Sequence, residues 1–330
     1  MKRSFWLRWL AGLAILAFLI LRTDFDEVFD ALGDADASIW LIVVPLNLVT
    51  LALATLRSKL VVQHMRHDVP AGILFSSVTL GFVAGSLTPA ASGELLRTDA
   101  LRATAGVPVE DGLALVAFER LMSFYLMLLS AAATGAILVL PPLPAGVVVA
   151  VCIAAVALPC LAPKLLRLLP PAGDMPSSVR GKLVHYVRTT AGRMEGLFQE
   201  RTLVGAWSLV TLGTFAVVAV QFWLMAESLG GGLDLIESLF AYGGSQVLSI
   251  LSLLPLGIGV SDGALVAITE RSGMAHDEAI AMAVLVRATI MLPLVLLAVS
   301  SYFHLTLIRS RNTVPTPPPA PEHSAEGLAD

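Results

Sequence analysis

The stretch SLTPAASGELLR, residues 86–97, interrupts an apolar run in a way that decides the fold. The apolar segment 71–88 breaks at a proline and two alanines, and the chain then restarts with Ser-Gly-Glu. A second stretch, SLLPLGIG at residues 252–259, repeats this pattern at the end of the apolar segment 236–256. Both breaks place polar residues inside otherwise apolar sequence, so they need a structural or chemical reason.

The composition is that of an integral membrane protein. Of the 330 residues, 56% are hydrophobic and only 14% are charged, and the mean hydropathy is +0.82. Soluble globular domains contain about 25% charged residues. We therefore expect an all-α polytopic membrane protein, in which the distribution of charge carries more information than the formal net charge of −4.

The apolar segments outnumber the membrane spans that we predict. A helix needs roughly 20 apolar residues to cross a bilayer core of about 30 Å. We predict that 71–105 and 236–272 are re-entrant hairpins, which leave the membrane on the side they entered, and that six segments span it. The first predicted span, near the N-terminus, is expected to be an uncleaved helix, because no small-residue cleavage site follows its apolar core. The predicted spans are 5–21, 39–56, 112–140, 145–161, 203–226 and 276–308.

The charges along the chain favour this arrangement. With six spans, the basic N-terminal tail, the 57–70 loop, the 162–202 loop and the C-terminus fall on one side of the membrane. The acidic residues of 24–36, together with Glu227 and Asp234, fall on the other side. Because cytoplasmic loops carry an excess of Lys and Arg, we predict a multi-pass protein of the cytoplasmic membrane with both termini in the cytoplasm.

The two breaks belong to an internal repeat. Each copy contains an apolar run, a break, a short polar helix, a glycine turn and a membrane helix with a buried arginine, Arg120 or Arg287. Three predicted spans separate the copies, so the second hairpin enters from the opposite face and the repeat is inverted. Inverted repeats with broken helices recur in secondary transporters. The aligned residues are Ser86, Leu87, Pro89 and Gly93 with Ser252, Leu253, Pro255 and Gly259.

The breaks supply helix N-termini within the membrane. Irregular backbone at membrane depth is tolerated only inside protein or along a cavity, so 88–93 and 255–261 should face one another or a shared cavity. Ser92 and Ser261 are predicted N-caps of the short helices that follow. Such N-termini favour an anion, for example phosphate or carboxylate.

Two arginines are predicted near the middle of the membrane. Arg120 and Arg287 lie roughly 12–16 Å into their helices at 1.5 Å per residue. An intramembrane arginine usually faces the protein interior and has a partner. Glu119 points about 100° away from Arg120 on a helix, so Glu94 and Asp262 are better candidates. These acids either complement the helix dipole or carry a proton, and the arginines either fasten the hairpins or receive a phosphate.

Other polar residues have less specific interpretations. Arg97 and Arg102 are expected to leave the first hairpin toward the cytoplasmic surface, where they either snorkel or recruit anionic head groups. Gln221, Gln246 and Ser245 are expected to form hydrogen bonds between helices. The 162–202 loop is either a solvated connector or contains an amphipathic interfacial helix at about 179–198.

The sequence offers no metal or catalytic set. Cys152 and Cys160 share one apolar segment, and the six histidines are scattered, with His64 and His67 in an expected solvated loop. No nucleotide-binding loop and no nucleophile–base pair is present in the sequence. We therefore expect no metal, no cofactor and no nucleic-acid partner.

The ordered motifs LTPAASGELLR…FER and LLPLGIGVSDGALV…VLVR resemble the lysylphosphatidylglycerol synthase transmembrane region, a flippase-like family. That family carries Pro-x-x-x-Gly-Glu-x-x-Arg, then Glu-Arg, then Pro-Gly-Gly-x-Gly-x-x-Glu, then another intramembrane arginine. The sequence departs from this pattern at Ala91, Leu256 and Asp262, where the family has a basic residue, glycine and glutamate. The resemblance, with the two predicted caps, implies a substrate site at Pro89, Ser92, Gly93, Glu94, Arg97, Glu119, Arg120, Pro255, Gly257, Gly259, Ser261, Asp262 and Arg287.

The resemblance also implies the domain organisation. Residues 1–311 would form the flippase-like domain, with halves at about 1–161 and 203–308 around the basic loop 162–202. Residues 312–330 are Pro-rich and polar, as in disordered tails. The synthase's aminoacyl-transferase domain has no counterpart here, so we expect a protein that is not itself an enzyme.

Three functions remain open at this point. The first is a translocase that binds a phospholipid or a polyprenyl-phosphate lipid between the two hairpins. The second is a secondary transporter of a small water-soluble anion. The third is an accessory protein that presents lipid to a membrane glycosyltransferase or synthase.

Overall fold

The computed structural model describes residue 33 and residues 37–88, 93–139 and 179–312 of the chain. Within these residues the protein is all-α, as the sequence predicts. The predicted spans 5–21 and 145–161, both cysteines and the Pro-rich tail beyond residue 312 lie outside the described residues.

The described elements follow one another in two similar series. Each series has a long helix, a hairpin of two shorter helices and a second long helix, which is interrupted in the second series. The elements are α3 (Ala37–His64), α4 (Ala71–Leu87), α5 (Leu95–Ala105), α6 (Val109–Val139), α8 (Val179–Gln199), α9 (Arg201–Ser228), α10 (Leu235–Ser252), η2 (Pro255–Gly257), α11 (Val260–Arg271), α12 (His276–Val286), η3 (Arg287–Met291) and α13 (Leu292–Asn312).

The long helices account for the predicted membrane spans. Of the six predicted spans, four fall on described helices that are long and apolar enough to cross a bilayer. The protein is therefore a multi-pass membrane protein. These four helices are Ser38–His64, Val109–Leu138, Arg201–Ser228 and His276–Ser310.

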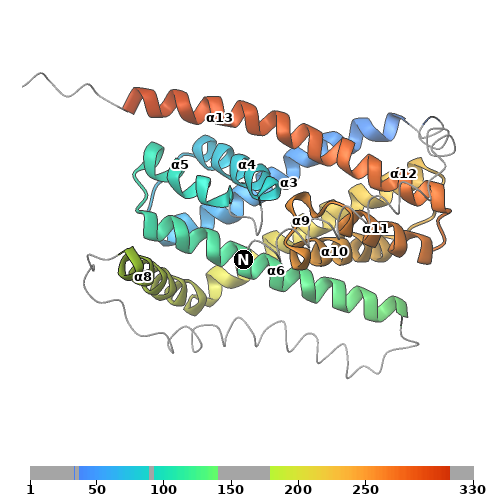
Figure 1. Ribbon diagram of the computed structural model, residues 1–330, viewed down its shortest axis with the longest axis horizontal. Coiled ribbons are helices and arrows are strands. Elements are labelled where there is room, and N and C mark those ends of the chain that lie inside the picture. Colours follow the sequence, from blue (N-terminus) through green and yellow to red (C-terminus); the bar gives the residue numbers. More distant parts are fainter. Residues whose placement is uncertain (1–32, 34–36, 89–92, 140–178, 313–330) are drawn as a thin grey trace, which may run out of the picture.

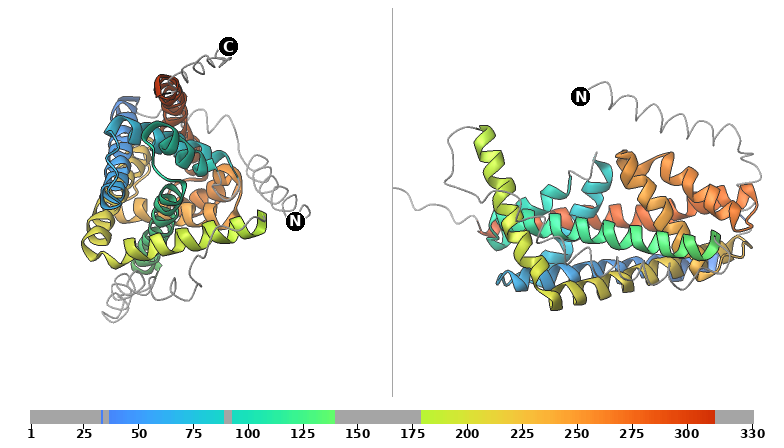
Figure 2. Two further views of the ribbon diagram at one scale, coloured as in Figure 1. Left: turned by 90° about the vertical axis from the view of Figure 1, so that its left-hand side faces the viewer. Right: turned by 90° about the horizontal axis from the view of Figure 1, so that it is seen from below.

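The two predicted hairpins are helical hairpins that lie toward opposite ends of the bundle. In Figure 1 the pair α4–α5 lies toward the left end of the long axis, and α10–α11 lies toward the right end. The view from below in Figure 2 shows the same separation. The break η2 packs against α4 of the first hairpin. The prediction that the two breaks face one another is not tested, because residues 89–92 lie outside the described residues.

The helices of the two series pack on one another reciprocally. Helices α3 and α9 pack along each other, α6 packs on α10, and α13 packs on α4. The shift that carries the first residue of α3 onto the first residue of α9 also carries Val43 onto Trp207 and Arg57 onto Gln221. Correspondingly, Arg57 stacks on the Trp207 ring at 5.2 Å, and Gln221 donates to the Val43 carbonyl at 3.1 Å. These paired contacts are what an inverted repeat requires.

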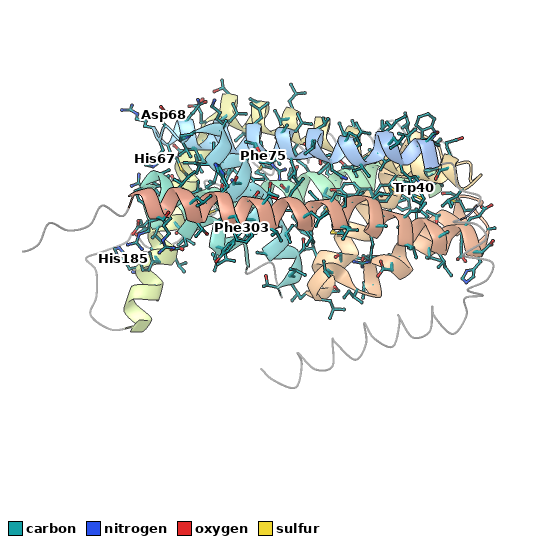
Figure 3. All side chains as sticks on the ribbon, turned by 90° about the horizontal axis from the view of Figure 1, so that it is seen from above. Trp40, His67, Asp68, Phe75, His185 and Phe303 are labelled. Atoms are coloured by element: carbon teal, nitrogen blue, oxygen red, sulfur yellow. The ribbon has the colours of Figure 1, made fainter. Side chains whose placement is uncertain are left out.

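Helix α8 realises the amphipathic helix that was one of two interpretations of the basic loop. Its buried side is fastened to α6 by the Phe118–Phe198 ring contact at 5.0 Å and by the Arg193–Asp111 ion pair at 3.2 Å. Figure 3 shows His185 of α8 at the same end of the bundle as His67, with Trp40 toward the other end. Helix α8 therefore covers the end at which α3 finishes.

The predicted 57–70 loop begins later in the sequence than we expected, so its predicted first residue is wrong. Helix α3 continues to His64, and Arg57 is a partly buried residue of this helix instead of a loop residue. The Arg57 side chain lies over Trp207 and donates to Ser123 Oγ at 3.3 Å. With these partners, the charged Arg57 side chain is accommodated in a helix that continues beyond the apolar run. A hydropathy profile does not show such contacts.

The second hairpin turns through two non-glycine residues with left-handed backbone. Leu253 closes α10 with φ of 56°, and Leu256 lies inside η2 with φ of 57°. A side chain in this region clashes with its own backbone, at a cost of about 1–2 kcal/mol. Leu256 is the position at which the related family has glycine, so the backbone explains that glycine.

We predict that Leu256→Gly raises the free energy of unfolding by about 1 kcal/mol, because glycine removes this clash. Leu254 is half-buried with ordinary φ, and Leu254→Gly should instead lower stability by about 1 kcal/mol or more. Thermal unfolding midpoints of both variants in one detergent measure the difference. Equal losses in the two variants would contradict the interpretation.

Candidate functional site

The first hairpin is joined to α6 by an ion pair within the membrane. Glu94 precedes α5, and Arg120 lies about three turns into α6. Arg120 Nε donates to Glu94 Oε2 at 2.5 Å, and Arg120 Nη2 donates to Glu94 Oε1. The pair is therefore bidentate, and the prediction that Glu94 rather than Glu119 partners Arg120 is confirmed.

Two glycines, Gly85 on α4 and Gly93 after the break, make room for this pair. A Cβ at Gly85 would lie 2.8 Å from Glu94 Cγ and 3.2 Å from Arg120 Nη2. Gly93, at the end of the break, donates its N–H to Thr88 Oγ1 at 2.6 Å, and a Cβ there would overlap the Ala84 carbonyl. The small residues thus allow the hairpin to close tightly enough to bring Glu94 to Arg120.

The second hairpin carries an equivalent pair. Arg287 Nε donates to Asp262 Oδ1 at 2.9 Å, and Arg287 Nη2 donates to Asp262 Oδ2 at 2.8 Å. Arg287 Nη2 also lies 3.2 Å from the Leu256 carbonyl and 3.4 Å from Ser261 Oγ. One arginine therefore binds the carboxylate of α11 and the backbone of the break together.

Gly259, not Ser261, is the N-cap of the second short helix, and Asp262 accepts its N–H. Gly259 is the N-cap of α11, with φ of 79°, and its N–H donates to Asp262 Oδ2 at 3.0 Å. The predicted cap at Ser261 is wrong, because α11 begins at Val260 and the Ser261 hydroxyl donates back to the Gly257 carbonyl at 3.0 Å. Asp262 thus complements the helix N-terminus and binds Arg287 at once.

The arginines of both pairs are more accessible than their carboxylates. The side chains of Arg120 and Arg287 are 40% and 31% exposed, against 12% for Glu94 and 17% for Asp262. Among the described residues, Nη1 of each arginine has no hydrogen-bond partner. The guanidinium is therefore the more exposed partner in each pair.

Arg97 and Glu119 form a different kind of pair. Their side chains are only 4% and 6% exposed, and Arg97 Nη1 donates to Glu119 Oε2 at 2.5 Å. Ser58 of α3 completes the cluster by donating to Glu119 at 2.7 Å and accepting from Arg97 at 2.7 Å. The prediction that Arg97 reaches the cytoplasmic surface is wrong, because this buried carboxylate holds it inside. Arg102, one turn and a half further on, is exposed.

The two halves differ at this buried cluster. The shift that aligns Arg120 with Arg287 places Val286 opposite Glu119, and the α3–α9 shift places Phe222 opposite Ser58. Among the described residues, the first short helix therefore has a buried ion pair to α6, Arg97–Glu119, in addition to the Glu94–Arg120 pair, and the second short helix has no buried equivalent of it.

The remaining predicted site residues fall around the breaks. Pro255 begins η2, and Gly257 has φ of 60° with Ser249 packed where a side chain would extend. Pro89 and Ser92 lie outside the described residues.

Sequence reasoning did not select Ser58 or Asn47. Asn47 accepts from Gln221 Nε2 at 3.1 Å, which also confirms Gln221 as an interhelical hydrogen-bonding residue. The sequence feature that could have identified Asn47 is its position as a single amide side chain within the apolar run 39–56.

The fold and the site together define a polytopic α-helical membrane protein in which two opposed hairpins each carry an acid–arginine pair. The family described as the lysylphosphatidylglycerol synthase TM region matches residues 6–298, and the chain belongs to this family. The resemblance of the ordered motifs is thereby confirmed.

A curated relative shows a more limited similarity. Glycosyltransferase AglD of Haloferax volcanii is 27% identical over 124 residues, which are 38% of this chain and 19% of the relative. The chain therefore matches about a fifth of the length of that protein. Together with the family, this relative indicates a membrane protein connected with lipids.

We predict that Glu119→Gln destabilises the protein by about 3–5 kcal/mol, because it leaves Arg97 as an uncompensated buried charge. Glu94→Gln should cost less, since Arg120 retains partial exposure. Thermal unfolding of both variants in the same detergent gives the order of the effects. A larger loss for Glu94→Gln would show that accessibility does not separate the two pairs.

Proposed function

We propose that the protein binds a phosphate-bearing lipid at the Glu94–Arg120 and Asp262–Arg287 pairs and moves it across the membrane. The observation that carries the proposal is the pair of equivalent, partly exposed arginines, one on each half of an inverted repeat. Arginine suits this role because its fork binds phosphate through two N–H groups, as it binds the carboxylate here.

The carboxylates make the site reversible. Without a ligand, Glu94 and Asp262 neutralise arginines that would be costly at membrane depth. An arriving phosphate competes for the same N–H groups, and the released carboxylate is then neutralised most readily by a proton. In this proposal the pairs combine lipid binding and proton exchange at one place, with no catalytic step by this chain.

The charge distribution supports an orientation for the transporter. The bundle end with the start of α6, the end of α13 and helix α8 carries Arg66, Arg193 and Arg309, whereas the other end carries Glu227, Asp234 and Asp277. The positive-inside rule then places the basic end in the cytoplasm, and the protein in the cytoplasmic membrane. Both termini would be cytoplasmic.

The relative named as a glycosyltransferase supports a second candidate function. In that protein a segment similar to this chain forms part of a much longer chain. The present protein would then present lipid to a separate membrane glycosyltransferase or synthase, with the same arginines holding the lipid phosphate.

The test is native mass spectrometry of the gently solubilised protein with identification of the bound lipids. We expect the wild type to retain one class of phospholipid or polyprenyl-phosphate lipid. In Arg120→Gln/Arg287→Gln we expect the lipid-bound fraction to fall by about tenfold, the loss expected when charge-assisted hydrogen bonds of about 1.5–3 kcal/mol are removed.

Arg102→Gln is the matched control, because Arg102 is an exposed arginine of the same first hairpin. It should leave the bound lipids unchanged. Identical lipids on the wild type and the double variant would mean that the arginines only fasten the hairpins. Reconstitution into vesicles then separates the two functions, because only a translocase moves the identified lipid between leaflets without a partner.

A further inference from the structure

The last long helix is interrupted next to Arg287, and its counterpart in the first half is not. Residues Arg287–Met291 form a π-helical turn, in which the Leu292 N–H donates to the Arg287 carbonyl five residues earlier. Helix α6 runs without such a break through Arg120. Single π-helical turns within α-helices occur frequently at functional sites.

A proline explains the interruption. In an α-helix the Thr289 carbonyl would accept from the N–H of residue 293, which is Pro293 and has none. The proline ring would also collide with that carbonyl. The alignment of Arg287 with Arg120 places Leu126 opposite Pro293, so the first half has no equivalent constraint.

A side chain from another helix fills the missing bond. Asn47 Nδ2 of α3 donates to the Thr289 carbonyl at 2.7 Å. Asn47 and Thr289 are 1% and 4% exposed, so water does not replace this donor. An unpaired carbonyl inside a membrane protein is expensive. The amide of Asn47 therefore stabilises the backbone in the arrangement that the π-helical turn gives it.

The Asn47 amide is itself oriented by α9. Gln221 Nε2 donates to Asn47 Oδ1 at 3.1 Å and to the Val43 carbonyl at 3.1 Å. Accepting from Gln221 fixes which end of the Asn47 amide faces Thr289. The contact between α3 and α9 is thus connected, through the Asn47 amide, to the π-helical turn that begins at Arg287.

We propose that Asn47 is a positioning residue for Arg287: by occupying the carbonyl that Pro293 leaves unpaired, it sets the direction in which Arg287 points at Asp262. Arg287 begins the π-helical turn, so a return of this turn to α-helical geometry rotates Arg287 relative to α13 by about 100° per residue of register. The inference concerns the same arginine as the proposed lipid site, but it is tested without lipid.

The test measures the reactivity of each arginine with phenylglyoxal, an arginine-specific reagent, in lipid-free detergent, with quantification by peptide mass spectrometry. In Asn47→Leu we expect the modification rate of Arg287 to rise roughly threefold to tenfold, the effect of losing one buried hydrogen bond. The rate at Arg120 should stay the same, which provides an internal reference.

The matched control is Thr211→Val. Thr211 corresponds to Asn47 in the α3–α9 shift and is also fully buried, but its hydroxyl donates only to the Trp207 carbonyl of its own helix. This variant should change neither arginine. An unchanged or lowered Arg287 rate in Asn47→Leu, or the same rise in Thr211→Val, would overturn the proposal.

A second variant removes the need for Asn47. In Asn47→Leu/Pro293→Leu, residue 293 regains an N–H for the Thr289 carbonyl, so the Arg287 rate should fall back toward that of Pro293→Leu alone. If Asn47→Leu does not fold, this double variant should recover the folded protein, and its failure to do so would also overturn the proposal. Absence of lipid from the wild type would contradict the proposed function alone, because the reagent reports geometry.

Discussion

The architecture depends on one constraint: a charge placed inside a membrane must have a partner within the protein. Arg120 and Arg287 lie on helices that are long and apolar enough to cross a membrane, Arg97 is buried on α5, and each of the three is bound by a carboxylate. The carboxylates come from the hairpins for Arg120 and Arg287, and from a long helix for Arg97. The hairpins therefore cannot be placed independently of the spans, because each contributes one half of an ion pair.

This constraint propagates into the small residues and turns. Glu94 reaches Arg120 only because Gly85 leaves space on α4, and Asp262 reaches Arg287 only because the break before α11 turns through left-handed backbone. In the second hairpin the strain at Leu256 is offset by its carbonyl, which accepts from Arg287. The loop geometry and the glycine position are thus required by the pairing of each carboxylate with its arginine.

Much of this was predictable from the sequence, and the parts that were not have a common cause. Four of the six predicted spans, the two helical hairpins and the Glu94–Arg120 pairing follow from apolar length, breaks and charge, which can be read from the sequence alone. The locations of Arg57 and Arg97 and the cap of α11 do not. Arg57 and Arg97 are placed by contacts with Trp207 and Glu119, which come from other helices. The cap of α11 depends on the residue at which the helix begins, which is Gly259. A motif shared by two halves identifies the site, but the partners of its charges come from the packing.

The two halves of the repeat are also chemically unequal, and this inequality follows from single substitutions. Glu119 gives the first half a second buried ion pair, which holds α5 against α6 and α3. Val286 occupies the equivalent place in the second half, so α11 has no such support, and Pro293 removes a backbone hydrogen bond close by. The backbone beside Arg287 then has neutral contacts from Asn47 and Gln221, in addition to the ion pair of Arg287 with Asp262. Neutral hydrogen bonds contribute less than charge-assisted ones, so the two acid–arginine pairs have different surroundings: a second buried ion pair lies beside the first, and neutral amide contacts lie beside the second.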